Sequence, residues 1–152
     1  MNHLILDPAT PNDMGDILII ERESFSSPWT YTMFLEEISN PLSRSLVARR
    51  RDLDAKALGY IFYQVVAFEM HILNLAVHPS FRSIGIGTAL LTESLQRENK
   101  LGTARYAFLE VRENNEGAIR LYQKLGFKKL GLRKNYYREE NINAVIMGRP
   151  IA

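Results

Sequence analysis

The chain has 152 residues, of which 46% are hydrophobic and 24% charged, and its formal net charge is +2. This length and balance predict a single globular domain over residues 1–152, and so small a charge gives no indication of direct nucleic-acid binding. The absence of cysteine excludes disulfides, thiolate metal sites and a cysteine nucleophile.

The sequence also gives no indication of a membrane or metal partner. Its first residues lack the basic start and apolar stretch of a signal peptide, and no apolar run approaches the roughly 18 residues of a membrane span. The three histidines lack the spacing of paired metal ligands. The one tight basic cluster, at residues 49–51, is interpreted as a solvated turn. We therefore expect a cytoplasmic protein without a metal ion.

In the N-terminal part we expect one short strand followed by two helices. The strand covers residues 4–6. The sequence Thr10-Pro11-Asn12-Asp13 has the threonine, proline and acid that are typical of a helix start, and the helix continues to about residue 24. A proline-containing loop follows at residues 25–29, and Thr30 can cap the second helix.

Three β-rich segments come next, at residues 45–49, 58–66 and 69–77. The last two are joined by only residues 67–68, which predicts an antiparallel pair. A glycine-containing turn then leads into a helix at about residues 86–99.

The C-terminal part predicts a strand at 105–111 and an amphipathic helix at 115–125 that ends at Gly126. Two strands, 127–133 and 144–147, complete the chain. This order of elements predicts an α/β (mixed α+β) fold, in which a central mixed sheet of about seven strands is flanked by about four helices.

The turn from Arg82 to Thr88 has the features of an anion site. Gly85 and Gly87 leave the backbone open to close approach, and free N–H groups at the following helix start favour a phosphate. The turn lacks the lysine of a P-loop and the third glycine of a dinucleotide fingerprint. On glycine spacing alone, a simple tight turn remains equally open.

The residues around this turn resemble a known family. The pattern Val77-x-Pro79-x-Phe81-Arg82-x-x-Gly85-x-Gly87 resembles the acetyl-CoA pyrophosphate motif of the GNAT acetyltransferases. The segments 109–112 and 115–127 resemble the second half of the family's sequence, in order and at the right spacing. Within the superfamily, segments 25–29 and 133–137 resemble the substrate loops of the ribosomal-protein-alanine N-acetyltransferases.

The resemblance implies a GNAT fold and acetyl-CoA as co-substrate. The acetyl-CoA site that it implies comprises Leu75, Ala76, Val77, Arg82, Ser83, Ile84, Gly85, Ile86, Gly87, Thr88 and Asn115. The substrate site that it implies comprises Phe25, Pro28, Trp29, Tyr136 and Tyr137. It further implies that Glu110 is the general base and Tyr122 the general acid. Asn114 and Gly117 depart from the family pattern, without removing a catalytic group.

The chemistry of the two catalytic candidates fits transfer of an acetyl group to a terminal amine. Such an amine has a pKa near 8, so about a tenth is neutral at pH 7, against about 0.04% of a lysine. One modest base such as Glu110 therefore suffices, although an ion pair with Arg105 or Arg112 is its structural alternative. Tyr122 lies on the apolar stripe of its helix, where core packing is the alternative to proton donation.

Three functions therefore remain open at this stage. The favoured one is acetylation of a protein N-terminus, with a small-subunit ribosomal protein beginning with alanine as the implied partner. The second keeps the chemistry but uses a lysine, a polyamine or another small amine as acceptor. The third is a CoA-binding module without catalysis, against which the presence of both Glu110 and Tyr122 argues.

Overall fold

A seven-stranded sheet runs through the computed structural model, which describes residues 3–137 and 140–152. The strand order is β1-β2-β3-β4-β5-β7-β6, and every neighbouring pair is antiparallel except β4 and β5. The strands are β1 (Leu4–Asp7), β2 (Ser43–Arg50), β3 (Ala57–Val66), β4 (Glu69–Val77), β5 (Tyr106–Arg112), β6 (Lys128–Tyr137) and β7 (Ile142–Pro150). Together with the helices this confirms the predicted mixed α/β fold.

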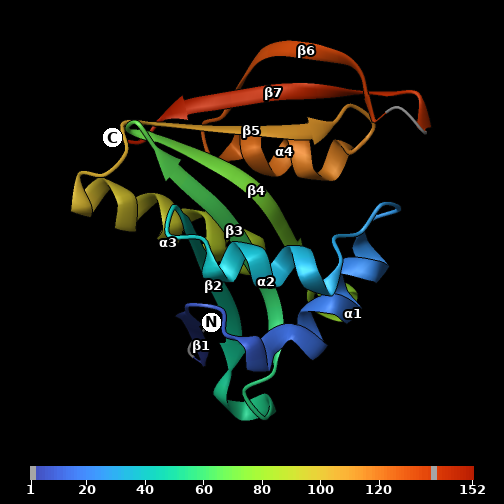
Figure 1. Cartoon of the computed structure of the whole chain (residues 1–152), viewed down its shortest axis with the longest axis vertical. Coiled ribbons are helices and arrows are strands. Elements are labelled where there is room, and N and C mark those ends of the chain that lie inside the picture. The colour runs from blue at the N-terminus through green and yellow to red at the C-terminus, as the bar shows by residue number, and fades with distance from the viewer. Residues whose placement is uncertain (1–2, 138–139) are drawn as a thin grey trace.

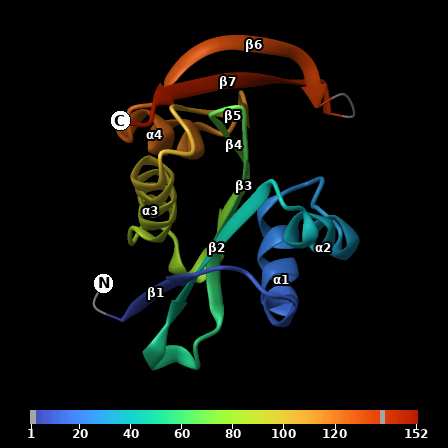
Figure 2. The ribbon, with the colours of Figure 1, turned by 60° about the vertical axis from the view of Figure 1, so that its left-hand side comes forward.

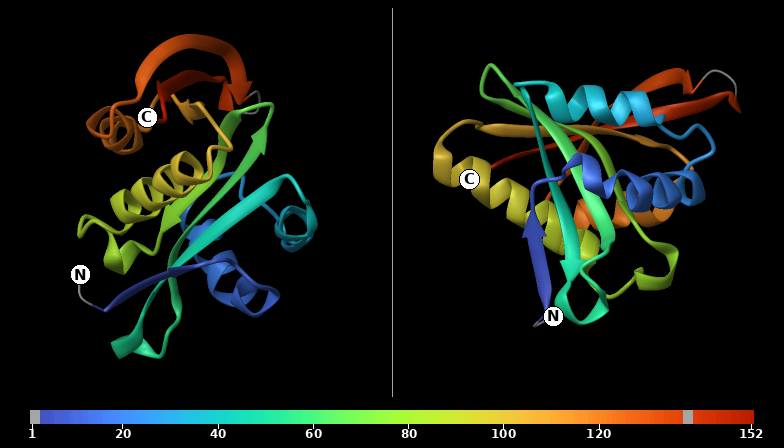
Figure 3. Two further views of the ribbon diagram at one scale, coloured as in Figure 1. Left: turned by 90° about the vertical axis from the view of Figure 1, so that its left-hand side faces the viewer. Right: turned by 60° about the horizontal axis from the view of Figure 1, so that its bottom comes forward.

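Two pairs of helices cover the two faces of the sheet, as Figure 2 shows. In the described residues the α-helices are α1 (Met14–Ser24), α2 (Tyr31–Ser39), α3 (Ile86–Leu101) and α4 (Glu116–Lys124). The first two pack on one face and the last two on the other, so the core is divided into two clusters (Figure 3). None of these helices is long and apolar enough to cross a membrane.

Local sequence signals account for the ends of several elements. The hydroxyl of Thr30 accepts the N–H of Met33 at the start of α2, as predicted. Residues Ala67 and Phe68 both adopt positive φ, which makes the tight antiparallel connection between β3 and β4. Gly126, with φ of +90°, ends α4, and the following residue turns back into the core.

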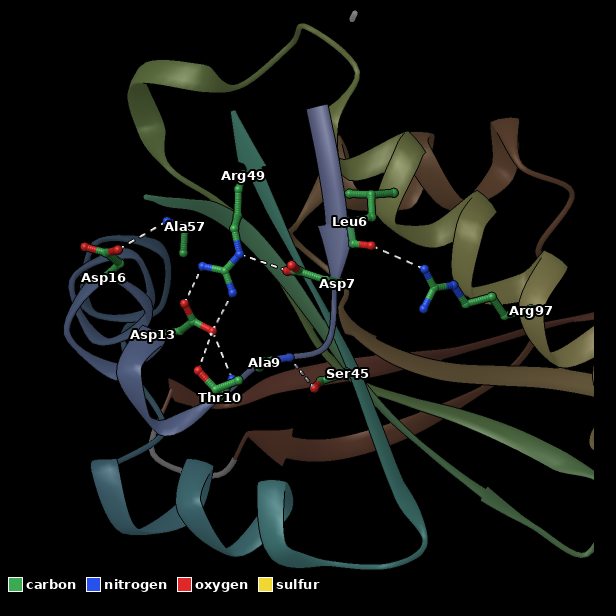
Figure 4. A network of polar contacts seen from close by, with 10 residues as sticks. All are labelled: Leu6, Asp7, Ala9, Thr10, Asp13, Asp16, Ser45, Arg49, Ala57 and Arg97. Atoms are coloured by element: carbon green, nitrogen blue, oxygen red, sulfur yellow. Dashed lines mark hydrogen bonds and ion pairs between the residues drawn. The ribbon is translucent and has the colours of Figure 1, made fainter. Parts of the chain in front are cut away.

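The interpretation of the arginine cluster at residues 49–51 as a solvated turn is correct for Arg51, which begins the exposed 3₁₀ turn Arg51–Leu53, but wrong for Arg49. Arg49 lies on β2, and its side chain is only 16% exposed. Its guanidinium donates to the carboxylates of Asp7, at 2.8 Å, and Asp13, at 2.5 and 2.7 Å (Figure 4). Arg49 therefore connects β1 and the start of α1 to β2. Arg50 pairs with Asp52 at the surface.

The two C-terminal strands are longer than predicted. The strand expected at 127–133 continues as β6 to Tyr137, through a register shift after Arg133. Its polar sequence is explained by its position at the edge of the sheet, where nearly all of its residues are exposed. The partner strand β7 begins at Ile142, before the predicted start at 144.

Candidate active site

The site lies where the two parallel strands separate. β4 and β5 pair over four residues each, from Glu69 opposite Tyr106 to Ile72 opposite Leu109. Beyond that point they diverge, as Figure 1 shows, and β4 continues beside β3 only. A divergence of this kind leaves the end of β4 facing a gap in the sheet, and three neighbouring cavities occupy this region.

The first cavity, here called the turn cavity, has a volume of about 490 Å³. It is bounded by the end of β4, the turn before α3 and the N-terminal half of α4. Its wall includes Leu75, Ala76, Val77, Arg82, Ser83, Gly85, Ile86, Gly87, Thr88 and Asn115. The structure thus brings together ten of the eleven residues proposed for acetyl-CoA. Ile84 is the exception, because its side chain is half exposed and outside this wall.

The conformation of the turn suits a phosphate group. Ser83 and Gly85 both have positive φ, and Gly85 is the N-cap of the 16-residue helix α3. Within residues 3–137 and 140–152 no side chain caps this helix start, so its first N–H groups are available to a ligand at the positive end of the helix dipole. Arg82 adds a full charge, and it holds the turn by donating to the carbonyl of Val77 and the hydroxyl of Ser24.

Gly87 lies at the start of α3 and lines the turn cavity. A Cβ at this position would lie 3.4 Å from Cδ2 of Leu121 and 3.7 Å from Cγ2 of Val77. It would therefore point toward α4 and the end of β4. Both of these side chains line the turn cavity, and the two distances are ordinary van der Waals contacts, so a Cβ would fit here without displacing either residue.

The second cavity, the inner cavity, has a volume of about 200 Å³ and lies on the other side of Tyr122. Glu110 and Tyr122 both line it, together with Phe25, Trp29 and Tyr137. Tyr122 also lines the turn cavity, so the inner and turn cavities share this side chain. The gap between β4 and β5 thus brings a carboxylate from the sheet and a phenol from α4 to one space.

The third cavity, the outer cavity, has a volume of about 530 Å³ and continues from the inner one. Trp29, Glu110 and Tyr137 line both of them, and Tyr136 lines the outer one. Four of the five residues proposed for the acceptor are therefore gathered at these cavities. Pro28 is exposed and lines neither of them.

Glu110 lies on β5 with its side chain 28% exposed. Its carboxylate pairs with Arg133 of β6, with 3.2 Å between Oε1 and Nη2, and neither of the expected partners is used. Arg112, on the same face of β5, turns instead to Glu140, and Arg105 lies over the ring of Phe68. Burial, and a hydrogen bond to Glu110, raise the pKa of Tyr136. Glu110 lines both the inner and the outer cavity, so its carboxylate lies at the boundary between them.

Tyr122 is buried, with 8% of its surface exposed, and its ring packs edge-on against Phe127 at 5.9 Å. Within the described residues no hydrogen bond is formed by its hydroxyl, and no buried polar side-chain atom is left without a partner. The hydroxyl oxygen is therefore open to one of the cavities. Burial, and to a smaller extent Tyr137, raise the pKa of Tyr122, so the phenol keeps its proton at neutral pH.

Two polar features of the site were missed by the sequence analysis. Glu21 of α1 and Asn74 of β4 line the inner cavity and are buried. The signal for Glu21 was its position on the apolar stripe of α1, four residues after the buried Ile17. The second feature is a bridge in which Glu140 accepts from Arg112 and from Ser26, which joins the loop at residues 25–29 to the end of β5.

In the described parts of the chain, no group of three or more histidine or acidic side chains is arranged to hold a metal ion. The site consists of an uncapped helix start, a carboxylate and a protonated phenol around adjoining cavities. Such a set of groups is equipped for binding a phosphorylated ligand and for moving protons.

Comparison with known proteins gives a consistent picture. Residues 14–127 match the model of the acetyltransferase (GNAT) family. A putative [ribosomal protein bS18]-alanine N-acetyltransferase of Bacillus subtilis is 35% identical over 136 residues, 89% of this chain and 87% of that protein. An N-alpha-acetyltransferase of Sulfurisphaera tokodaii is 30% identical, over 94% of this chain and 90% of that one. The crystal structure of the ribosomal-protein-S18-alanine N-acetyltransferase from Escherichia coli superposes with a TM-score of 0.88 at 28% identity, covering 98% and 94% of the two chains.

Proposed function

Because this chain belongs to the acetyltransferase (GNAT) family, we propose that it transfers the acetyl group of acetyl-CoA to the N-terminal amine of a protein, specifically to an N-terminal alanine of a ribosomal protein. The observation that carries the proposal is that Glu110 and Tyr122 both line the inner cavity. This cavity adjoins the turn cavity on one side and the proposed acceptor loops, residues 25–29 and 133–137, on the other. The names of the relatives from Bacillus subtilis and Sulfurisphaera tokodaii support the choice of an α-amine.

In the turn cavity, the free N–H groups at the start of α3 bind the pyrophosphate of acetyl-CoA, and Arg82 adds positive charge. The end of β4, at Leu75 to Val77, lies along the pantetheine arm and the thioester. Asn115, which also caps α4 by accepting the N–H of Ala118, holds the same arm. These residues bring the thioester next to Tyr122.

On the acceptor side, the amine enters through the outer cavity, between Trp29, Tyr136 and Tyr137. Glu110 takes a proton from the ammonium group, directly or through a water molecule. The neutral amine then forms the new C–N bond at the thioester carbonyl while the C–S bond breaks. Tyr122 donates its proton to the departing sulfur, which leaves as the CoA thiol, and the raised pKa keeps the phenol protonated until that moment. The nitrogen of the new amide then gives up its second proton, which returns to Tyr122 through the solvent.

The proposed acceptor also implies where and in what form the enzyme acts. Acetylation of a ribosomal protein takes place in the cytoplasm, and we propose that residues 1–152 act there as one domain.

The test is release of CoA thiol from acetyl-CoA in the presence of matched peptides. We expect turnover with a peptide that begins with alanine, and little with an N-terminally blocked peptide that carries an internal lysine. No turnover with any amine would favour a binding module, and equal turnover with lysine would make the proposed acceptor wrong.

A further inference from the structure

We propose that Glu21 is a positioning residue for this reaction, which fixes the loop at residues 25–29 against β4 and so sets the geometry of the acceptor cavities. The proposal rests on the function proposed above, because it assigns this loop to the acceptor. Glu21 is 1% exposed on α1 and lines the inner cavity.

Glu21 joins three separate parts of the site. Its Oε1 accepts the hydroxyl of Tyr60 at 2.6 Å and the amide Nδ2 of Asn74 at 2.8 Å. Its Oε2 accepts the backbone N–H of Trp29 at 2.9 Å. All three partners are hydrogen-bond donors, so the carboxylate of Glu21 holds them together by accepting all three hydrogen bonds. A buried charge with three hydrogen bonds is costly to disturb, so this arrangement is rigid.

Each partner belongs to a part of the catalytic apparatus or its support. Asn74 lies just beyond the last residue of β4 that pairs with β5, opposite Phe62 of β3 and next to a register shift. Leu75 to Val77, which line the turn cavity, follow it directly. Trp29 is the last residue of the loop, and its ring packs on Phe34 at 5.1 Å. Glu21 therefore links the strand that lies along acetyl-CoA to the loop that receives the amine.

The chain contains a matched control for this carboxylate. Glu98 of α3 is also 1% exposed, and it accepts the hydroxyl of Tyr63, a second tyrosine of β3, at 2.7 Å. Its other partners are Thr103 and Arg44, and it lines none of the three cavities described above. Glu21→Gln and Glu98→Gln thus make the same chemical change in two comparable buried sites, only one of which contacts the loop.

The effect of Glu21→Gln can be localised from the geometry. Glutamine has one accepting oxygen and one donating NH₂ group. The orientation that loses fewer bonds keeps the oxygen toward Tyr60 and Asn74, which places the NH₂ group against the N–H of Trp29. The contact that breaks is therefore the one to the loop.

Two measurements test the proposal. Trp29 is the only tryptophan of the chain, so its emission and its quenching by acrylamide report the loop without interference. We expect Glu21→Gln to shift the emission to longer wavelength and to increase quenching. In peptide acetylation, the KM for the peptide should rise by about tenfold or more, the scale of a lost hydrogen bond to a charged group, while the Kd for acetyl-CoA stays within about twofold.

Glu98→Gln should lose comparable stability and change neither the emission nor the KM for the peptide. Parental emission and KM in Glu21→Gln, or equal changes in both variants, would overturn the proposal. If Glu21→Gln does not fold, the pair Glu21→Asp and Glu98→Asp decides in the same way, because the shorter side chain keeps the charge but withdraws the carboxylate of Glu21 from Trp29. Failure of the parent to acetylate any α-amine would contradict the proposed function instead, and the fluorescence of Trp29 would still decide the position of the loop.

Discussion

Replacing Tyr122 with phenylalanine removes one hydroxyl group from the wall between the turn cavity and the inner cavity. The ring and its edge-on contact with Phe127 remain. Since the hydroxyl forms no hydrogen bond within the described residues, its loss should change the free energy of unfolding by less than about 1 kcal/mol. If Tyr122 protonates the departing thiolate, the rate should nevertheless fall by about 10² or more, the range for a lost general acid.

The assay compares kcat of the parent and of Tyr122→Phe with acetyl-CoA and an alanine-starting peptide, alongside urea unfolding of both. The Kd for acetyl-CoA should change little, because a thioester sulfur is a weak acceptor. A folded variant that retains a kcat within about threefold of the parent would refute the assignment, and Tyr122 would then be a packing residue.

Three further substitutions test other parts of the account. Glu110→Gln should lower kcat by roughly 10² to 10⁴, and leave the Kd for acetyl-CoA unchanged in a calorimetric titration. A near-parental kcat would mean that Glu110 is a structural residue that pairs with Arg133 and is not the general base. Ser83→Glu should weaken acetyl-CoA binding by about tenfold or more in the same titration, because it adds a like charge beside the pyrophosphate; an unchanged Kd would contradict the phosphate site. Burial alone would raise the pKa of Asp13, but hydrogen bonds from Arg49 and Thr10 and the charge of Arg49 together lower it. The stability that this provides is complete above the unfolded pKa of about 3.9 and is lost as the pH falls through the lower folded value. Asp13→Asn should therefore reduce the free energy of unfolding by about 2 kcal/mol at pH 7 and by clearly less at pH 3, and an equal loss at both pH values in urea titrations would contradict the ion pair.

Where structure is set by neighbouring residues, the sequence predicted it well. The start of α2 at Thr30, the start of α4 near Asn115 and its end at Gly126 all depend on contacts within a few residues. The turn from Arg82 to Thr88 was recognisable as an anion site for the same reason, whereas the rest of the wall of the turn cavity was implied by the resemblance to the GNAT family.

Features that depend on distant partners could not be predicted from one sequence. Glu21 meets Asn74 across 53 positions, and Arg49 meets Asp13 across 36, so neither pairing leaves a local pattern. The sequence suggested nearby arginines as alternative ion-pair partners of Glu110. Arg133 comes close to Glu110 only because the strand order β5-β7-β6 places β6 two strands away from β5. Similarly, the last four residues of β6 were not predicted as strand, because their polar sequence reflects the exposed position of β6 at the sheet edge.

The central claim is that the site acetylates an α-amine, and mass spectrometry of the product tests it most directly. A peptide that begins with alanine and contains one internal lysine is incubated with acetyl-CoA and the enzyme, and fragment ions then locate the acetyl group. The account predicts that the acetyl group lies on the N-terminal amine, and that Tyr122→Phe and Glu110→Gln both suppress it. Acetylation mainly on the lysine side chain would contradict the account.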